Sequence, residues 1–109
     1  MNVWFRMQKL ETDFLVKLLI MKKTLVIGAS ENPQRYSNLA VNRLIASGHE
    51  VVAIGNRNGC IGTVYIETEK LPFENIHTVT LYINPSRQAD YYAYIISLNP
   101  QRIIFIRDV

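Results

Sequence analysis

The stretch TLVIGASENPQRYSN, residues 24–38, decides the fold class. Its first part, Thr24 to Ile27, is a short and mostly apolar run, typical of a strand buried on both faces of a parallel sheet. Gly28 ends this run, and a polar loop then leads to Ser37, which we predict to be the N-cap of a helix. The stretch therefore predicts a strand, a loop and a helix in that order.

The remainder of the chain repeats this alternation. Gly48 stands where the C-cap of the first helix belongs. Further strands are predicted at residues 50–54, 77–83 and 102–106, with a short edge strand at 63–66, a loop or single helical turn at 67–75, and a helix from Asn84-Pro85 to about Leu98 that Asn99-Pro100 ends. Strands alternating with helices imply right-handed crossovers. We therefore expect an α/β fold, a Rossmann-like parallel sheet with helices on both faces.

The segment before this domain has a different pattern. Apolar residues recur there at helical spacing, at Val3, Met7, Leu10, Phe14, Leu18 and Met21. This spacing predicts an amphipathic N-terminal helix over residues 1–21, followed by the domain at 22–109. Three interpretations remain open: a docking or dimerisation helix, a stretch that covers part of the core, or a segment upstream of a natural start at Met21.

The composition limits the classes of function. The chain has 109 residues, 49% of them hydrophobic and 19% charged, as in a single soluble domain. The net charge of +3 arises within residues 1–23, so the body lacks the sustained basic face of a nucleic-acid binder. The most apolar run, residues 14–21, is far shorter than the roughly 20 residues that span a bilayer. A lone Cys60 and two scattered histidines offer no disulfide and no metal-ligand spacing, which suits a cytoplasmic location.

The loop after the first predicted strand resembles a phosphate site in outline. Ligands of doubly wound sheets bind beyond the carboxyl ends of the strands. Backbone N–H groups of Gly28 and Ala29, together with the Ser30 hydroxyl, can face a phosphate at the positive end of the following helix. A dinucleotide fingerprint would also have glycine at positions 30 and 33, where this chain has Ser30 and Pro33. The alternative is that Gly28 only makes a turn.

The loops after the other two central strands distinguish between cofactors. NAD sites place an Asp or Glu at the end of the second strand, whereas this chain has Gly55, Asn56 and Arg57. Arg57 would attract a phosphate carried on the ribose, which favours NADP or coenzyme A over NAD; its alternative is a solvated surface arginine. The third loop supplies Asn84 and Ser86, as helix caps or as ligand contacts.

No catalytic constellation emerges from the sequence. His49 and His77 are expected at the amino ends of strands, opposite the crevice. Cys60 is either a small surface residue or a reactive thiol, but it has no evident base beside it. We therefore predict no catalytic residue and no metal site, and we expect a binding protein rather than an enzyme.

Several segments together resemble the small stand-alone coenzyme A-binding proteins of bacteria. They are LVIGASENPQRYSN (25–38), LIASGHEV (44–51), IGNR (54–57), GTVY (62–65) and YINP (82–85). The family is similar to the coenzyme A-binding domain of the succinyl-CoA synthetase alpha chain, in which the catalytic histidine belongs to another domain. The resemblance implies binding of the ADP part of coenzyme A without catalysis. It implies the following contacts: Gly28, Ala29, Ser30, Tyr36 and Ser37 near the phosphates, Asn56 and Arg57 near the adenosine or its 3′-phosphate, and Asn84 at the same rim.

The chain departs from that family in two places. Family members usually have Asn-Pro after the second strand, and they usually continue beyond the last strand predicted here with a further helix and strand. We therefore expect a domain that lacks this last helix and strand. The N-terminal extension or a partner chain, including a second copy, would cover the open sheet edge; otherwise the chain is a truncated product. Two other functions remain open: an NAD(P)-dependent oxidoreductase or a fragment of one, and a regulatory or interaction protein acting through the N-terminal helix.

Overall fold

Six strands and two helices occupy residues 22–106, the part of the chain that the computed structural model describes. The amphipathic helix predicted for residues 1–21 lies outside this part. In chain order the elements are β1 (Lys23–Ala29), α2 (Tyr36–Ala46), β2 (Val51–Gly55), β3 (Gly59–Ile61), β4 (Val64–Glu67), β5 (Ile76–Leu81), α3 (Pro85–Leu98) and β6 (Arg102–Phe105).

The six strands form one sheet in the order β3-β4-β2-β1-β5-β6. β1 lies near the centre and pairs in parallel with β2 and β5, while β4 and β6 continue the parallel pattern outward. β3 pairs antiparallel with β4, so the sheet is mixed and the prediction of a wholly parallel sheet is wrong at this edge. The predicted edge strand exists as β4, but β3 lies outside it. A tight hairpin allows this antiparallel pairing, since Gly62 turns the chain with φ +58°.

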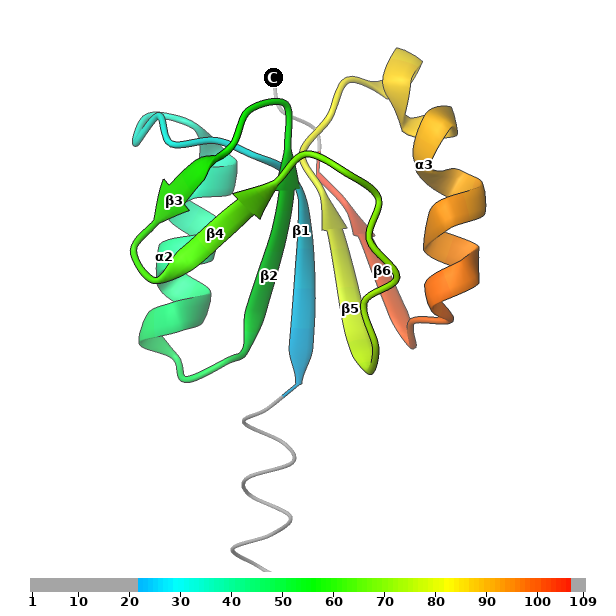
Figure 1. Ribbon diagram of the computed structural model, residues 1–109, viewed down its shortest axis with the longest axis horizontal. Helices are drawn as coiled ribbons and strands as arrows, with labels where there is room; N and C mark the ends of the chain where they lie inside the picture. The colour runs from blue at the N-terminus through cyan, green and yellow to red at the C-terminus, as the bar shows by residue number, and fades with distance from the viewer. Residues whose placement is uncertain (1–21, 107–109) are drawn as a thin grey trace, which may run out of the picture.

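The two helices cover opposite faces of the sheet, as predicted (Figure 1). Alternate residues of β1 belong to two separate clusters, because successive side chains of a strand point to opposite faces. Leu25 and Ile27 belong to the cluster that contains Ile95 of α3, while Val26 belongs to the cluster that contains Val41 of α2. This two-sided burial explains why residues 25–27 of β1 are all apolar.

The sequence predicted the C-terminal end of α2 correctly but not its N-terminal end. Gly48, with φ +82°, lies in a Schellman motif in which its N–H bonds the Ile45 carbonyl and the His49 N–H bonds the Leu44 carbonyl, both at 3.0 Å. The predicted N-cap at Ser37 is wrong, because Arg35 occupies that position and its side chain makes no capping hydrogen bond. A turn closed by the Arg35 N–H and the Asn32 carbonyl, at 3.1 Å, starts the helix at Tyr36. Ser37 is therefore already inside the first turn.

The three loops singled out in the sequence meet at one edge of the sheet. Figure 1 shows the loops after β1, β2 and β5 together at the upper edge, where α2 and α3 also begin. His49 precedes β2 and His77 lies at the start of β5, at the opposite edge, as predicted. Neither helix within residues 22–106 is long and apolar enough to cross a membrane.

Candidate functional site

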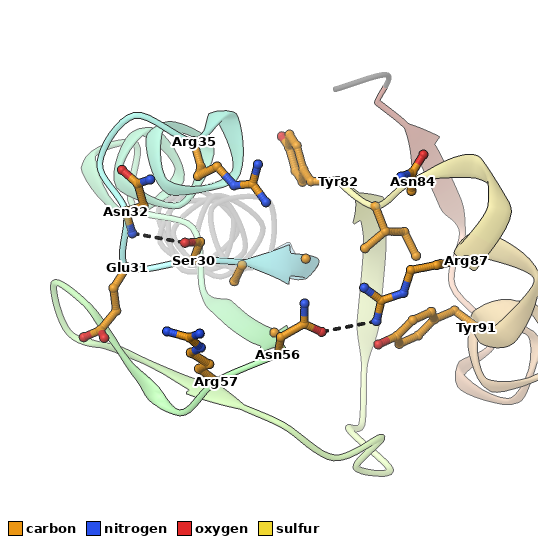
Figure 2. Close-up of a pocket in the computed structure, with 14 residues that line it drawn as sticks. Ser30, Glu31, Asn32, Arg35, Asn56, Arg57, Tyr82, Asn84, Arg87 and Tyr91 are labelled. Carbon is orange, nitrogen blue, oxygen red and sulfur yellow. Dashed lines mark hydrogen bonds between the residues drawn. The ribbon is translucent and has the colours of Figure 1, made fainter. Parts of the chain in front are cut away.

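A cleft of about 700 Å³ opens at the carboxyl edge of the sheet. It lies between the loop that follows β1, the loop that follows β2 and the segment from Tyr82 to the first turns of α3 (Figure 2). Six of the eight predicted site residues line it: Gly28, Ala29, Ser30, Asn56, Arg57 and Asn84. The structure thus brings together residues from three loops that are far apart in the chain.

The floor of the cleft is formed by the close approach of three strand ends. Gly28 has φ +92°, and a Cβ there would lie 2.6 Å from the Tyr82 carbonyl oxygen. The pairing of β1 with β2 shifts between Ile27 and Ala29, which is the bulge that places Gly28 against the end of β5. A Cβ on Gly55 would lie 2.3 Å from the Ala29 carbonyl oxygen. Glycine at these two positions therefore lets backbone pack directly on backbone beneath the cleft.

The first loop is held in shape by its own side chains. Ser30 Oγ accepts a hydrogen bond from the Asn32 N–H at 3.1 Å, and Asn32 Oδ1 accepts one from the Gln34 N–H at 3.0 Å. Such turns, in which a side chain caps the backbone two residues on, fix a loop without a regular element. The loop is therefore preorganised at the mouth of the cleft (Figure 2).

Asn38 connects this loop to α2, and it was not among the predicted site residues. Its Nδ2 donates to the Ser30 carbonyl at 2.9 Å, and its Oδ1 accepts from Asn42 Nδ2 at 2.9 Å. Asn38 is only 7% exposed, and it lies three residues before buried Val41, on the inward face of the helix. A polar residue in the apolar stripe of a helix was the signal that could have revealed this role.

Basic side chains outnumber acidic ones around the cleft. Arg35, Arg57 and Arg87 line it, and Glu31 is the carboxylate among its lining residues. Glu31 Oε2 accepts a hydrogen bond from the Cys60 N–H of β3 at 3.1 Å, which draws this carboxylate toward the hairpin. Figure 2 shows the three guanidinium groups arranged around the cleft. This arrangement favours an anionic ligand.

Arg87 crosses the cleft from α3 and was not among the predicted site residues. Its Nη2 donates to Asn56 Oδ1 at 3.3 Å, which links the first turn of α3 to the loop after β2 (Figure 2). The two residues are 31 positions apart, so only the tertiary fold shows that they meet.

Both helices that begin at the cleft have open N-termini. The first turns of α2 and α3 contain no acidic residue, and neither N-cap side chain makes a capping hydrogen bond. Asn84 occupies the N-cap position of α3 as predicted, but its side chain does not act as a cap. Pro85 opens that helix, where its missing N–H costs nothing. Two positive helix ends thus add to the three arginines.

The other two predicted site residues do not line the cleft. Ser37 is 2% exposed within α2. Tyr36 is 56% exposed and lines a separate shallow groove on the α2 side. Tyr82 lines both the cleft and this groove, and burial raises the pKa of its hydroxyl. Tyr82 therefore stays a neutral hydrogen-bonding group at physiological pH.

The loop before β5 packs against α3 and makes hydrogen bonds with it. The Tyr94 hydroxyl donates to the Leu71 carbonyl, and burial, with Tyr91 nearby, raises the pKa of Tyr94 to about 12. Lys70 Nζ donates to the Asp90 carbonyl at 2.6 Å and lies 4.8 Å from the centre of the Tyr91 ring. Residues 22–106 contain no group of three or more His, Cys, Asp or Glu side chains that could hold a metal ion.

Comparison with known proteins adds a family and a fold relative. The model of a family described as a CoA binding domain matches residues 22–109. A solved structure titled "Crystal structure of uncharacterized protein" is 46% identical in sequence, with a TM-score of 0.75, over 78% of this chain and 70% of that chain. No curated protein matches the chain.

Proposed function

The chain belongs to the CoA binding domain family, and we propose that its cleft binds coenzyme A or an acyl-CoA through the ADP part, without catalysis of its own. The observation that carries the proposal is the set of three arginines around a cleft whose lining includes Arg35 and Asn84, the N-cap residues of α2 and α3. Coenzyme A carries a diphosphate and a separate 3′-phosphate. A ligand with several separated negative charges suits such a site.

The diphosphate would lie over the first loop. Gly28, Ala29, Ser30 and Arg35 line this part of the cleft. The backbone is accessible there because Gly28 has no side chain and Ala29 has a small one. Asn84, at the start of α3, would contact the ligand from the opposite rim.

The adenosine and its 3′-phosphate would lie beside the loop after β2. Arg57 lines the cleft there, next to Asn56, whose side-chain oxygen already accepts a hydrogen bond from Arg87. Two guanidinium groups thus reach this region from different elements. We assign the 3′-phosphate to Arg57, because this side chain follows the strand that contacts the ribose in related folds.

NADP is the second candidate ligand. Arg57 could equally hold a 2′-phosphate, and the absence of a carboxylate at Gly55 to Arg57 disfavours NAD. An oxidoreductase, or a fragment of one, would then be the function. The third candidate, a regulatory or interaction protein, depends on residues 1–21; deletion of residues 1–20 should then abolish association while ligand binding persists.

Isothermal titration calorimetry with coenzyme A, dephospho-CoA, NAD and NADPH tests these assignments. We expect coenzyme A to bind most tightly. Arg57→Ala should weaken its binding about 10- to 100-fold, the value of a charge-assisted hydrogen bond, and should leave dephospho-CoA unaffected. Arg102→Ala is the matched control, because Arg102 is an exposed arginine at the start of β6, at the other edge of the sheet. Absence of coenzyme A binding refutes the proposal, and preferential NADPH binding favours the oxidoreductase.

A further inference from the structure

A shallow groove of about 260 Å³ adjoins the cleft on the α2 side. Its lining is mostly apolar or aromatic: Tyr36, Leu39, Ala40, Arg43, Tyr82 and Ile106. Tyr36 and Leu39 are 56% and 45% exposed, so this surface is open to a ligand. Tyr82 lines both the cleft and the groove, so the two lie against the same side chain.

The order of the strands gives the bound ligand a direction. β2, β1 and β5 are neighbours in that order, and the cleft residues Arg57, Ser30 and Tyr82 follow these three strands. A ligand with its adenosine at Arg57 and its diphosphate over Ser30 therefore continues toward Tyr82. The part that reaches Tyr82 is the arm that carries the thiol or thioester.

Two paths lead onward from Tyr82, and they differ in chemistry. On the α3 side, Arg87 spans the cleft to Asn56, and Asn84 and Tyr91 also lie there (Figure 2). On the α2 side, the groove is lined by Leu39 and Ala40 together with the side chains of Tyr36 and Tyr82. An apolar chain gains free energy on the second path because it buries hydrocarbon surface, whereas the first path would place it among hydrogen-bonded polar groups.

We propose that the groove beside α2 receives the acyl end of an acyl-CoA, so that the protein prefers thioesters with apolar acyl chains to free coenzyme A. This inference rests on the proposed binding of the ADP part in the cleft. It also gives Tyr36 a role different from the phosphate contact expected from the sequence: its ring forms a wall of the acyl groove.

Calorimetry with coenzyme A, acetyl-CoA and octanoyl-CoA, below the concentration at which the last forms micelles, tests the inference. We expect octanoyl-CoA to bind the full chain about tenfold more tightly than acetyl-CoA, because a shallow groove covers only part of the added methylene groups. Leu39→Ser should reduce this ratio to about threefold or less and leave the affinity for free coenzyme A unchanged. Ile96→Ser is the matched control, since Ile96 is an exposed apolar residue of the other helix.

The outcomes separate the two proposals. Equal affinities for all three ligands would overturn the acyl groove and leave the binding of the ADP part standing. A chain-length preference that Leu39→Ser does not reduce would place the acyl chain elsewhere and also overturn the inference. Absence of binding by free coenzyme A and by both thioesters would refute the proposed function and the acyl groove with it.

Discussion

The two edges of the sheet differ in how their charged groups are arranged. At the carboxyl edge, three arginines and one glutamate surround an open cleft. At the amino edge, Lys23 Nζ lies 3.4 Å from Glu50 Oε2, and the two charges satisfy each other. The same strands thus end in a cleft with mostly basic charged groups at one edge and beside a lysine–glutamate pair at the other.

This difference follows from the direction of the chain. The crossovers through α2 and α3 leave the sheet at the carboxyl edge, so both helix N-termini, with their positive ends, collect there. The helix C-termini lie toward the amino edge, where local motifs satisfy them. Gly48 closes α2, and Asn99, with φ +51°, closes α3. Substitutions at the two edges test whether the carboxyl edge is specialised for binding.

Gly28→Ala should have the largest effect. Its methyl group would meet the Tyr82 carbonyl at 2.6 Å in a residue whose φ is +92°, so both strain and a clash with backbone oppose it. We expect a loss of about 3 kcal/mol in the free energy of unfolding, measured by urea denaturation. Gly62→Ala is the control: its φ is +58°, but its Cβ meets Ile45 Cδ1 at an ordinary 3.5 Å, so about 1 kcal/mol is expected. Equal losses would show that the packing beneath the cleft has no special importance.

Asn38→Ala should cost about 2 kcal/mol of stability, since it leaves the Ser30 carbonyl without its side-chain donor at a part-buried position. We also expect weaker coenzyme A binding by calorimetry, because the first loop loses its tie to α2. Asn42→Ala, which removes only the outer partner of Asn38, should cost less than about 1 kcal/mol. Unchanged ligand affinity in Asn38→Ala would contradict the idea that this contact preorganises the cleft.

The sequence predicted the fold wherever burial determined the local pattern. β1, β2, β5 and both helices carry apolar runs or stripes that match their layers. β3 was missed because Gly59-Cys60-Ile61 has only three residues and follows a glycine- and asparagine-rich loop. β3 pairs with β4 because a hairpin joins the two strands, and not because its own sequence is a long apolar run. The spacing of apolar residues could therefore not predict the antiparallel strand at this edge of the sheet.

The site residues that could be predicted from the sequence are those that lie at the ends of strands. Strand ends placed Gly28 to Ser30, Asn56, Arg57 and Asn84 at one edge, because parallel strands share their carboxyl ends. Arg87 was missed because its contact with Asn56 depends on how α3 meets the sheet. Tyr36 and Ser37 do not line the cleft, because α2 begins at Tyr36 after N-cap Arg35 and both residues are already inside the helix.

Tyr94→Phe tests whether the hydrogen bond between α3 and the loop before β5 stabilises the fold beside the cleft. We expect a loss of about 1 kcal/mol near neutral pH, for one hydrogen bond to the Leu71 carbonyl. Because folding raises the pKa of Tyr94 from 10.0 to about 12, the folded state favours the neutral hydroxyl. Its contribution is complete below pH 10 and declines as the pH rises from about 10 to about 12. Urea denaturation across this pH range should show a shallower decline for the variant, and equal slopes would contradict the assignment.

Glu50→Gln should have the smallest effect, and it tests the amino edge directly. The Glu50 side chain is 46% exposed and that of Lys23 is 19% exposed, so water and salt screen their attraction. We expect a loss below about 0.5 kcal/mol in urea denaturation, smaller still at high salt, with no change in coenzyme A affinity. A loss as large as that of Asn38→Ala would mean that paired charges stabilise the amino edge as strongly as buried hydrogen bonds stabilise the cleft. The contrast between a closed edge of weak ion pairing and an edge built for an anion would then no longer hold.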